Sequence, residues 1–83
     1  MNRQMTIKFE RQAAKQIEAL DTLTKARIKR GIDGLPNGDI KKLQGYNATY
    51  RLRIGSYRVI YSISEDSIII KAVLPRGSAY KNI

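Results

Sequence analysis

Two β-rich runs joined by a Gly-Ser pair constrain the fold of this chain more than any other feature. The runs cover residues 50–54 and 57–63, and both are rich in Tyr, Ile and Val. Such runs on either side of Gly55-Ser56 are typical of a β-hairpin with a two-residue turn. The turn length fixes the register, so we expect these pairs: Ile54 with Tyr57, Arg53 with Arg58, Leu52 with Val59, and Arg51 with Ile60.

A third strand is predicted over residues 67–74, after a turn at residues 64–67. It runs antiparallel to the second run with Ile63 opposite Ile68, and Pro75 ends it because proline has no N–H to donate. Side chains alternate between the two faces of a strand. The face expected to pack on helices carries Tyr50, Leu52, Ile54, Tyr57, Val59, Tyr61, Ile68, Ile70, Ala72 and Leu74. The opposite face carries Arg51, Arg53, Arg58, Ile60, Ile69, Lys71 and Val73.

The second of these faces brings arginines together. Arg53 lies opposite Arg58, and like charges in that position destabilise a sheet. Arg76 follows the third strand at the end beside Arg58, Arg51 is one pleat away, and Tyr80 follows in the tail. Guanidinium groups that converge in this way suit a phosphate or a carboxylate, because each can donate two hydrogen bonds to it. The alternative interpretation is a set of solvated surface charges.

The first half of the chain has helical periodicity. Residues 5–9 alternate as a short strand, and Asp21 or Thr22 can cap a second helix that Gly34 and Pro36 end. The apolar stripes of the two helices are Phe9, Ala13, Ile17 and Leu20 in the first, and Ile28, Ile32 and Leu35 in the second. We therefore expect one α+β domain over residues 1–83. A short N-terminal strand and a two-helix hairpin pack on one face of a mainly antiparallel β-meander.

Charge and composition narrow the function. Sixteen Lys and Arg against seven Asp and Glu give 83 residues a net charge of +9, which favours nucleic acid, an anionic membrane or an acidic protein as partner. Cys and His are absent and the acidic residues are scattered, so we expect no disulfide, no metal and no cofactor. The longest apolar run is Ile68-Ile69-Ile70 and residues 1–5 do not read as a signal peptide. We expect a cytoplasmic protein without a membrane partner.

Cleavage of RNA is a reaction that these residue types can support. RNA carries its own nucleophile, the 2′-OH, so a protein needs to orient it, stabilise charge on the phosphate and move two protons. Arginine serves the first two tasks but stays protonated. Tyr80 is the candidate for proton transfer near the cluster, because guanidinium groups favour its ionised form. A structural role for Tyr80 is the alternative.

The whole chain resembles the RelE/ParE toxin superfamily, and its RelE branch in particular. The residues that carry the resemblance are Leu43 and Gly45, the hairpin from Tyr50 to Tyr61, and the Arg76…Tyr80 tail. The resemblance implies a toxin of a bacterial toxin–antitoxin pair. It also implies a metal-independent endoribonuclease that cuts mRNA in the ribosomal A site by 2′-OH attack.

The resemblance also implies roles and partners. The catalytic set is Arg51, Arg53, Arg58, Arg76 and Tyr80, and we assign RNA binding to Lys41, Lys42, Lys71 and Lys81. The expected partners are an acidic antitoxin, the 30S A site of the ribosome and mRNA, with no small-molecule cofactor.

The chain departs from the RelE pattern at two places. Arginines stand at 51 and 53 where well-studied members have lysines, and Pro75 stands where many relatives carry His. Because Arg does not readily replace Lys in proton transfer, these departures point to slower catalysis or to help from ribosomal RNA groups. The alternatives are a ParE-like inhibitor of DNA gyrase and a plain RNA-binding module.

Overall fold

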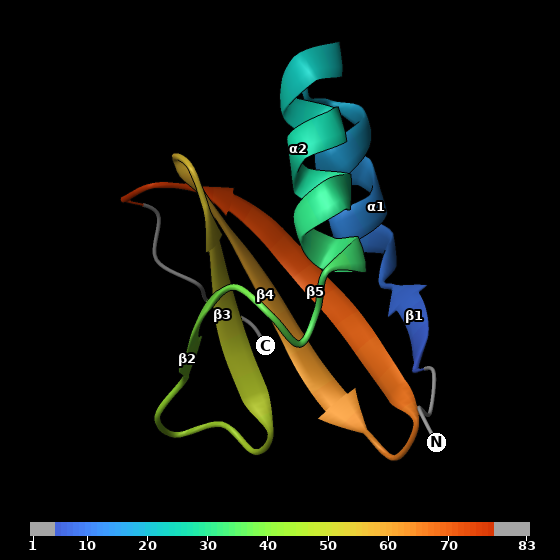
Figure 1. The fold of residues 1–83 in the computed structure, drawn as a ribbon, viewed down its shortest axis with the longest axis vertical. Coiled ribbons are helices and arrows are strands. Elements are labelled where there is room, and N and C mark those ends of the chain that lie inside the picture. The colour runs from blue at the N-terminus through green and yellow to red at the C-terminus, as the bar shows by residue number, and fades with distance from the viewer. Residues whose placement is uncertain (1–4, 78–83) are drawn as a thin grey trace.

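The structure, a computed structural model that describes residues 5–77, is a twisted five-stranded sheet with two helices (Figure 1). Its elements are β1 (Thr6–Phe9), α1 (Arg11–Glu18), α2 (Thr22–Asp33), β2 (Asp39–Lys42), β3 (Thr49–Ile54), β4 (Tyr57–Ser64) and β5 (Ser67–Pro75). The strand order is β1-β5-β4-β3-β2. β1 pairs with β5 in parallel and the other pairs are antiparallel. The predicted α+β class is confirmed, and no helix in residues 5–77 is long and apolar enough to cross a membrane.

The central hairpin has the predicted register. Arg53 pairs with Arg58, Leu52 with Val59, Ile54 with Tyr57 and Arg51 with Ile60. Ile63 also pairs with Ile68, as expected. The two-residue turn places Gly55 at φ +56°, a left-handed conformation that glycine adopts without steric cost.

Because β5 contains a β-bulge, the predicted faces of some of its side chains are wrong. Tyr61 pairs with Ile70 but Ile60 pairs with Ala72, so Lys71 is an extra residue and the alternation of β5 reverses beyond it. Val73, predicted on the arginine face, pairs with Val59 and lies in the core. Ala72 and Leu74, predicted on the helix face, lie opposite Ile60 and Arg58 on the arginine face.

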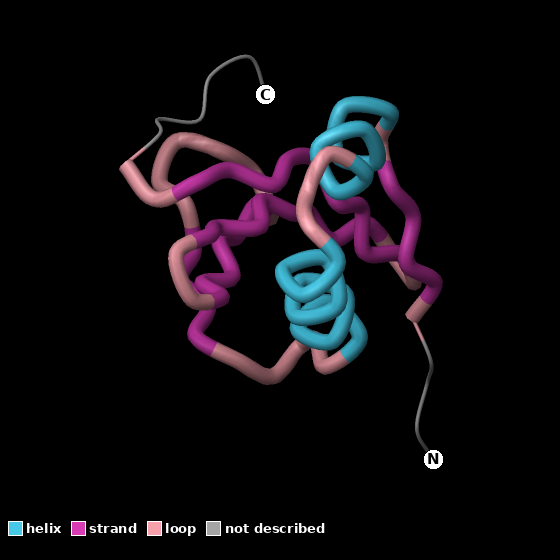
Figure 2. The backbone as a smooth tube through the Cα atoms, turned by 90° about the horizontal axis from the view of Figure 1, so that it is seen from above, coloured by secondary structure: helices cyan, strands magenta, loops and turns pink. Residues whose placement is uncertain are grey.

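The core lies between the helices and the other face of the sheet. It is formed by the buried residues Ala13, Ile17, Ile28, Ile32, Leu52, Val59, Tyr61, Ile68, Ile70 and Val73. Figure 2 shows the two helices end-on, beside each other. Asp21 caps α2, because its Oδ2 accepts a hydrogen bond from the Thr24 N–H at 3.2 Å, and Gly34 follows the last turn. Phe9 was wrongly assigned to the first helical stripe: it pairs with Ile70 in β1 and its side chain is 44% exposed.

Two glutamines of α1 form hydrogen bonds with backbone groups at the edge of β5, where β1 no longer pairs with it. β1 pairs with β5 as far as Ile70. Beyond that point Gln16 Oε1 accepts a hydrogen bond from the Val73 N–H at 2.6 Å, and Gln12 Nε2 donates to the Lys71 carbonyl at 3.3 Å. The bond to Val73 is part-buried, where backbone groups need such partners, and the bond to Lys71 is exposed. The helix therefore holds the strand beyond the bulge.

β2 is a strand that we did not predict from the sequence. It pairs with β3 and forms one edge of the sheet, with Asp39 opposite Arg53 and Lys41 opposite Arg51. The pairing extends the arginine face sideways by one strand. A carboxylate and a lysine are thereby added to that face.

Candidate anion-binding site

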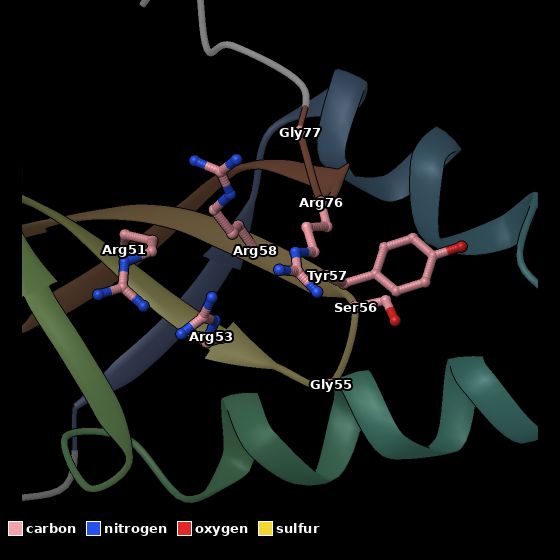
Figure 3. A pocket seen from close by; sticks show the side chains of 8 residues that line it. All are labelled: Arg51, Arg53, Gly55, Ser56, Tyr57, Arg58, Arg76 and Gly77. Carbon is pink, nitrogen blue, oxygen red and sulfur yellow. The ribbon is translucent and has the colours of Figure 1, made fainter.

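Four arginines line one hollow at the turn of the β3–β4 hairpin (Figure 3). The hollow measures about 370 Å³, and its lining residues are Arg51, Arg53, Gly55, Ser56, Tyr57, Arg58, Arg76 and Gly77. In the close view the four guanidinium groups lie on the same side of the hairpin, whereas the ring of Tyr57 points away from them. The convergence predicted from the register is therefore present.

Each arginine is placed by backbone pairing. Arg51 and Arg53 lie two residues apart on β3 and so share a face, and Arg58 on β4 lies directly opposite Arg53. Arg76 comes just after β5, and its N–H donates a 2.6 Å hydrogen bond to the Ser56 carbonyl in the hairpin turn. This bond brings Arg76, 18 or more residues further along the chain, to the other three.

The cluster carries more positive charge than its surroundings neutralise. Asp39 Oδ1 lies 3.7 Å from Arg51 Nη1, but the Asp39 side chain is 59% exposed and such a pair is worth little. Within residues 5–77, Arg53, Arg58 and Arg76 form no ion pair. An anion of the size of a phosphate would relieve the mutual repulsion and accept hydrogen bonds from several guanidinium groups.

The structure separates the predicted site residues into three groups. It brings Arg51, Arg53, Arg58 and Arg76 together, and it places Lys41 and Lys42 on a neighbouring groove that Arg51 and Arg58 also line. Lys71 lies elsewhere, because at the bulge its Nζ pairs with Glu10 Oε2 at 3.1 Å. Tyr80 and Lys81 lie outside the described residues.

Sequence reasoning missed Asp39 and also Tyr46, which lies in the loop between β2 and β3, as residues beside the arginines. The signal for Asp39 was the alternation of Asp39, Ile40 and Lys41 after the turn, which is compatible with an edge strand. Nothing in the sequence placed Tyr46 of that loop near Arg51 and Arg58.

Tyr50 and Tyr61, on the helix face, are structural. The rings of Tyr50 and Tyr61 stack with their centroids 5.5 Å apart. Burial, with a smaller effect of Tyr50, raises the pKa of the Tyr61 hydroxyl, so this group keeps its proton.

No cluster of acidic side chains that could hold a metal ion occurs in residues 5–77. The arrangement offers charge and hydrogen-bond donors to an anion.

Known toxins match this chain over most of its length. Residues 7–80 match the family of ParE toxins of type II toxin–antitoxin systems. Toxin RelE3 of Methanocaldococcus jannaschii is 33% identical over 84 residues, which cover 92% of this chain and 96% of that protein.

Solved structures share the fold. The toxin of the archaeal RelE–RelB complex from Pyrococcus horikoshii is 30% identical with a TM-score of 0.74, over 90% of this chain and 98% of that one. The isolated RelE toxin of E. coli has the same TM-score, 0.74, at 16% identity over 90% of this chain and 87% of that one, which shows a common fold.

The chain belongs to the RelE/ParE superfamily of toxins from type II toxin–antitoxin systems. Within that superfamily it is a toxin of the RelE type.

Proposed function

We propose that this toxin is a ribosome-dependent endoribonuclease that cleaves mRNA in the A site. The observation that carries the proposal is the convergence of Arg51, Arg53, Arg58 and Arg76 on one hollow. A hollow of this charge fits the phosphodiester of a single RNA strand. Binding at such a site positions the phosphate and stabilises the charge that grows on it during the reaction.

The reaction proposed is attack of the 2′-oxygen on the adjacent phosphorus. The 2′-OH loses its proton as the 2′-oxygen bonds to phosphorus. The bond from phosphorus to the 5′-oxygen breaks, and that oxygen takes up a proton. The products are a 2′,3′-cyclic phosphate and a 5′-OH, and no metal is required. Arg58 and Arg76 bind the non-bridging oxygens, and Arg51 and Arg53 bind the flanking backbone. Tyr80 orients the nucleotide and is the candidate group for proton transfer.

Primer extension on mRNA after induced expression tests the proposal. We expect cuts within translated codons for the wild type, and their loss, together with relief of growth arrest, for Arg58→Ala/Arg76→Ala. Loss of one preorganised charge-stabilising donor typically costs about 100-fold or more in rate. Arg27→Ala is the matched control, because Arg27 is an exposed arginine of α2 outside the hollow. Full toxicity and unchanged cuts in the double variant would exclude this site.

Inhibition of DNA gyrase is the second candidate, because the matching family description is that of ParE toxins. That function predicts DNA-damage signalling on expression while mRNA stays intact. The same cultures therefore separate the two candidates. The cleavage patterns also separate an RNase from a plain RNA-binding module, which would leave mRNA uncut.

We also propose that an acidic antitoxin binds this chain and neutralises the charge of the arginine hollow. We place both proteins in the cytoplasm. The toxins from Pyrococcus horikoshii and Methanococcus jannaschii were crystallised as complexes of RelE with RelB. The net charge of +9 favours an acidic partner segment that folds on binding. Co-expression with an acidic antitoxin that binds this chain should restore growth, and Arg53→Gln/Arg58→Gln should weaken the complex.

A further inference from the structure

A second groove lies beside the arginine hollow on the same face of the sheet. It measures about 610 Å³, and its lining residues are Lys41, Lys42, Leu43, Gln44, Tyr46, Arg51, Arg58, Ile60 and Leu74. Arg51 and Arg58 line both cavities, so they form the boundary between them. A ligand whose charge is bound in the hollow can therefore extend directly into the groove.

The lining of the groove differs in chemistry from that of the hollow. Leu74, which is half-buried, gives it apolar surface, whereas Ile60 is only 2% exposed. Leu74 faces this side because the bulge at Lys71 reverses the alternation of β5. Tyr46, which is 41% exposed, contributes an aromatic ring. It belongs to the loop that joins β2 to β3, and Figure 1 shows this loop. Lys41 and Lys42, at the end of β2 where this loop begins, supply positive charge. Apolar and aromatic surface does not stabilise a bound phosphate, but it does stabilise a flat heterocycle that stacks on it.

We propose that this groove binds a nucleobase of single-stranded RNA, with Tyr46 as the ring on which the base stacks. The inference rests on the proposed function, because the base belongs to a nucleotide next to the phosphate held by the arginines. Exposed aromatic rings within a basic groove are the usual means of binding unpaired bases. The four cations around the groove, Lys41, Lys42, Arg51 and Arg58, favour a polyanion over a neutral ligand.

The test measures binding of a labelled RNA heptamer by fluorescence anisotropy at low salt. The RNA is fully 2′-O-methylated so that it cannot be cleaved, and a second series carries one abasic nucleotide at each position in turn. Tyr46→Ala should weaken binding of the intact RNA by between about 5-fold and about 100-fold, the range for one base stacked on an aromatic ring. Tyr46→Phe keeps the ring and should bind as the wild type does.

Phe9→Ala is the matched control for loss of an exposed aromatic side chain. Phe9 is 44% exposed, close to the 41% of Tyr46, but it lies on β1 at the opposite edge of the sheet. It should leave the affinity unchanged. At one position of the RNA, removal of the base should weaken binding to the wild type but not to Tyr46→Ala. This result would show that the base and the ring interact.

Arg53→Gln and Arg76→Gln separate failure of the inference from failure of the proposed function, because these residues line the hollow and not the groove. If they weaken binding but Tyr46→Ala matches Phe9→Ala, the groove inference is overturned and the RNA site stands. If no variant changes the affinity, or if no RNA binds, the groove inference is overturned, and primer extension on mRNA after induced expression still decides the proposed function. If Tyr46→Ala weakens binding of an acidic antitoxin peptide and not of RNA, the groove takes a protein side chain and the inference is wrong.

Discussion

The arginine hollow should make the free protein less stable than it could be, and Arg53→Gln measures the effect. Arg53 lies directly opposite Arg58, and Arg51 and Arg76 line the same hollow. Asp39 is opposite Arg53 on β2, but its carboxylate pairs with Arg51. A like-charged pair directly across two strands costs up to about 1 kcal/mol, and we take about 0.5 kcal/mol for this pair, in which Arg53 is exposed and Arg58 half-buried. In a chain of this size, removal of a repulsion of that free energy by Arg53→Gln raises the unfolding midpoint by about 2–4 °C. Gln keeps most of the side-chain length, so packing is little changed.

The control is Arg27→Gln on the exposed surface of α2, which lowers the net charge from +9 to +8 just as Arg53→Gln does. Thermal unfolding followed by circular dichroism should show a higher midpoint for Arg53→Gln than for the control at low salt. The difference should disappear near 1 M salt, where the screening length falls to about 3 Å. An equal or lower midpoint for Arg53→Gln at low salt would refute the repulsion. A difference that persists at high salt would show that its cause is packing.

Three further predictions concern the framework that holds the site. Gly31→Ala should lower the free energy of unfolding by about 1 kcal/mol despite the better helix propensity of Ala, because the added Cβ would lie 2.3 Å from Ile54 Cδ1; Ile54→Val should recover part of this loss in chemical denaturation. Gln16→Ala should cost about 1–2 kcal/mol in the same measurement, because the Val73 N–H loses its acceptor. Tyr61→Phe should reduce the loss of stability at alkaline pH. Burial raises the pKa of the Tyr61 hydroxyl, so its contribution is complete below the ordinary tyrosine pKa and is lost as the pH rises through the folded-state pKa.

Each of these predictions has a result that contradicts it. Gln12→Ala is the control for Gln16→Ala, because its 3.3 Å bond is exposed, and equal losses for the two would show that burial of the bond does not matter. Strict additivity of the Gly31 and Ile54 changes would show that these residues do not clash. An alkaline unfolding curve that is identical for wild type and Tyr61→Phe would show that other groups set the upper pH limit.

The arginine site was predictable because its geometry is local. A two-residue turn permits one register, so the sequence placed Arg53 opposite Arg58 and Arg51 on the same face. The antiparallel third strand then carried Arg76 back to the turn. The core positions Leu52, Val59, Tyr61, Ile68 and Ile70 followed from the same alternation.

Three features were not predictable in this way. β2 has one apolar side chain, Ile40, between charged ones, so its strand conformation depends on pairing with β3. Phe9 fits the helical spacing by coincidence, but its backbone pairs with Ile70 in the parallel ladder. The bulge at Lys71 leaves no mark in the sequence, because the run from Ile68 to Leu74 alternates acceptably in either facing.

The sequence by itself thus determined the hairpin, its register and the charge that its outer face carries, because short turns and strand alternation are properties of neighbouring residues. Tertiary structure decided the facing of Ala72, Val73 and Leu74, and with it the apolar surface of the groove beside the arginines. The contacts that accompany the bulge join distant segments: Gln16 and Val73 are 57 residues apart, and Glu10 and Lys71 are 61 apart. Contacts of that range form only when α1 packs against β5, and no local pattern encodes them.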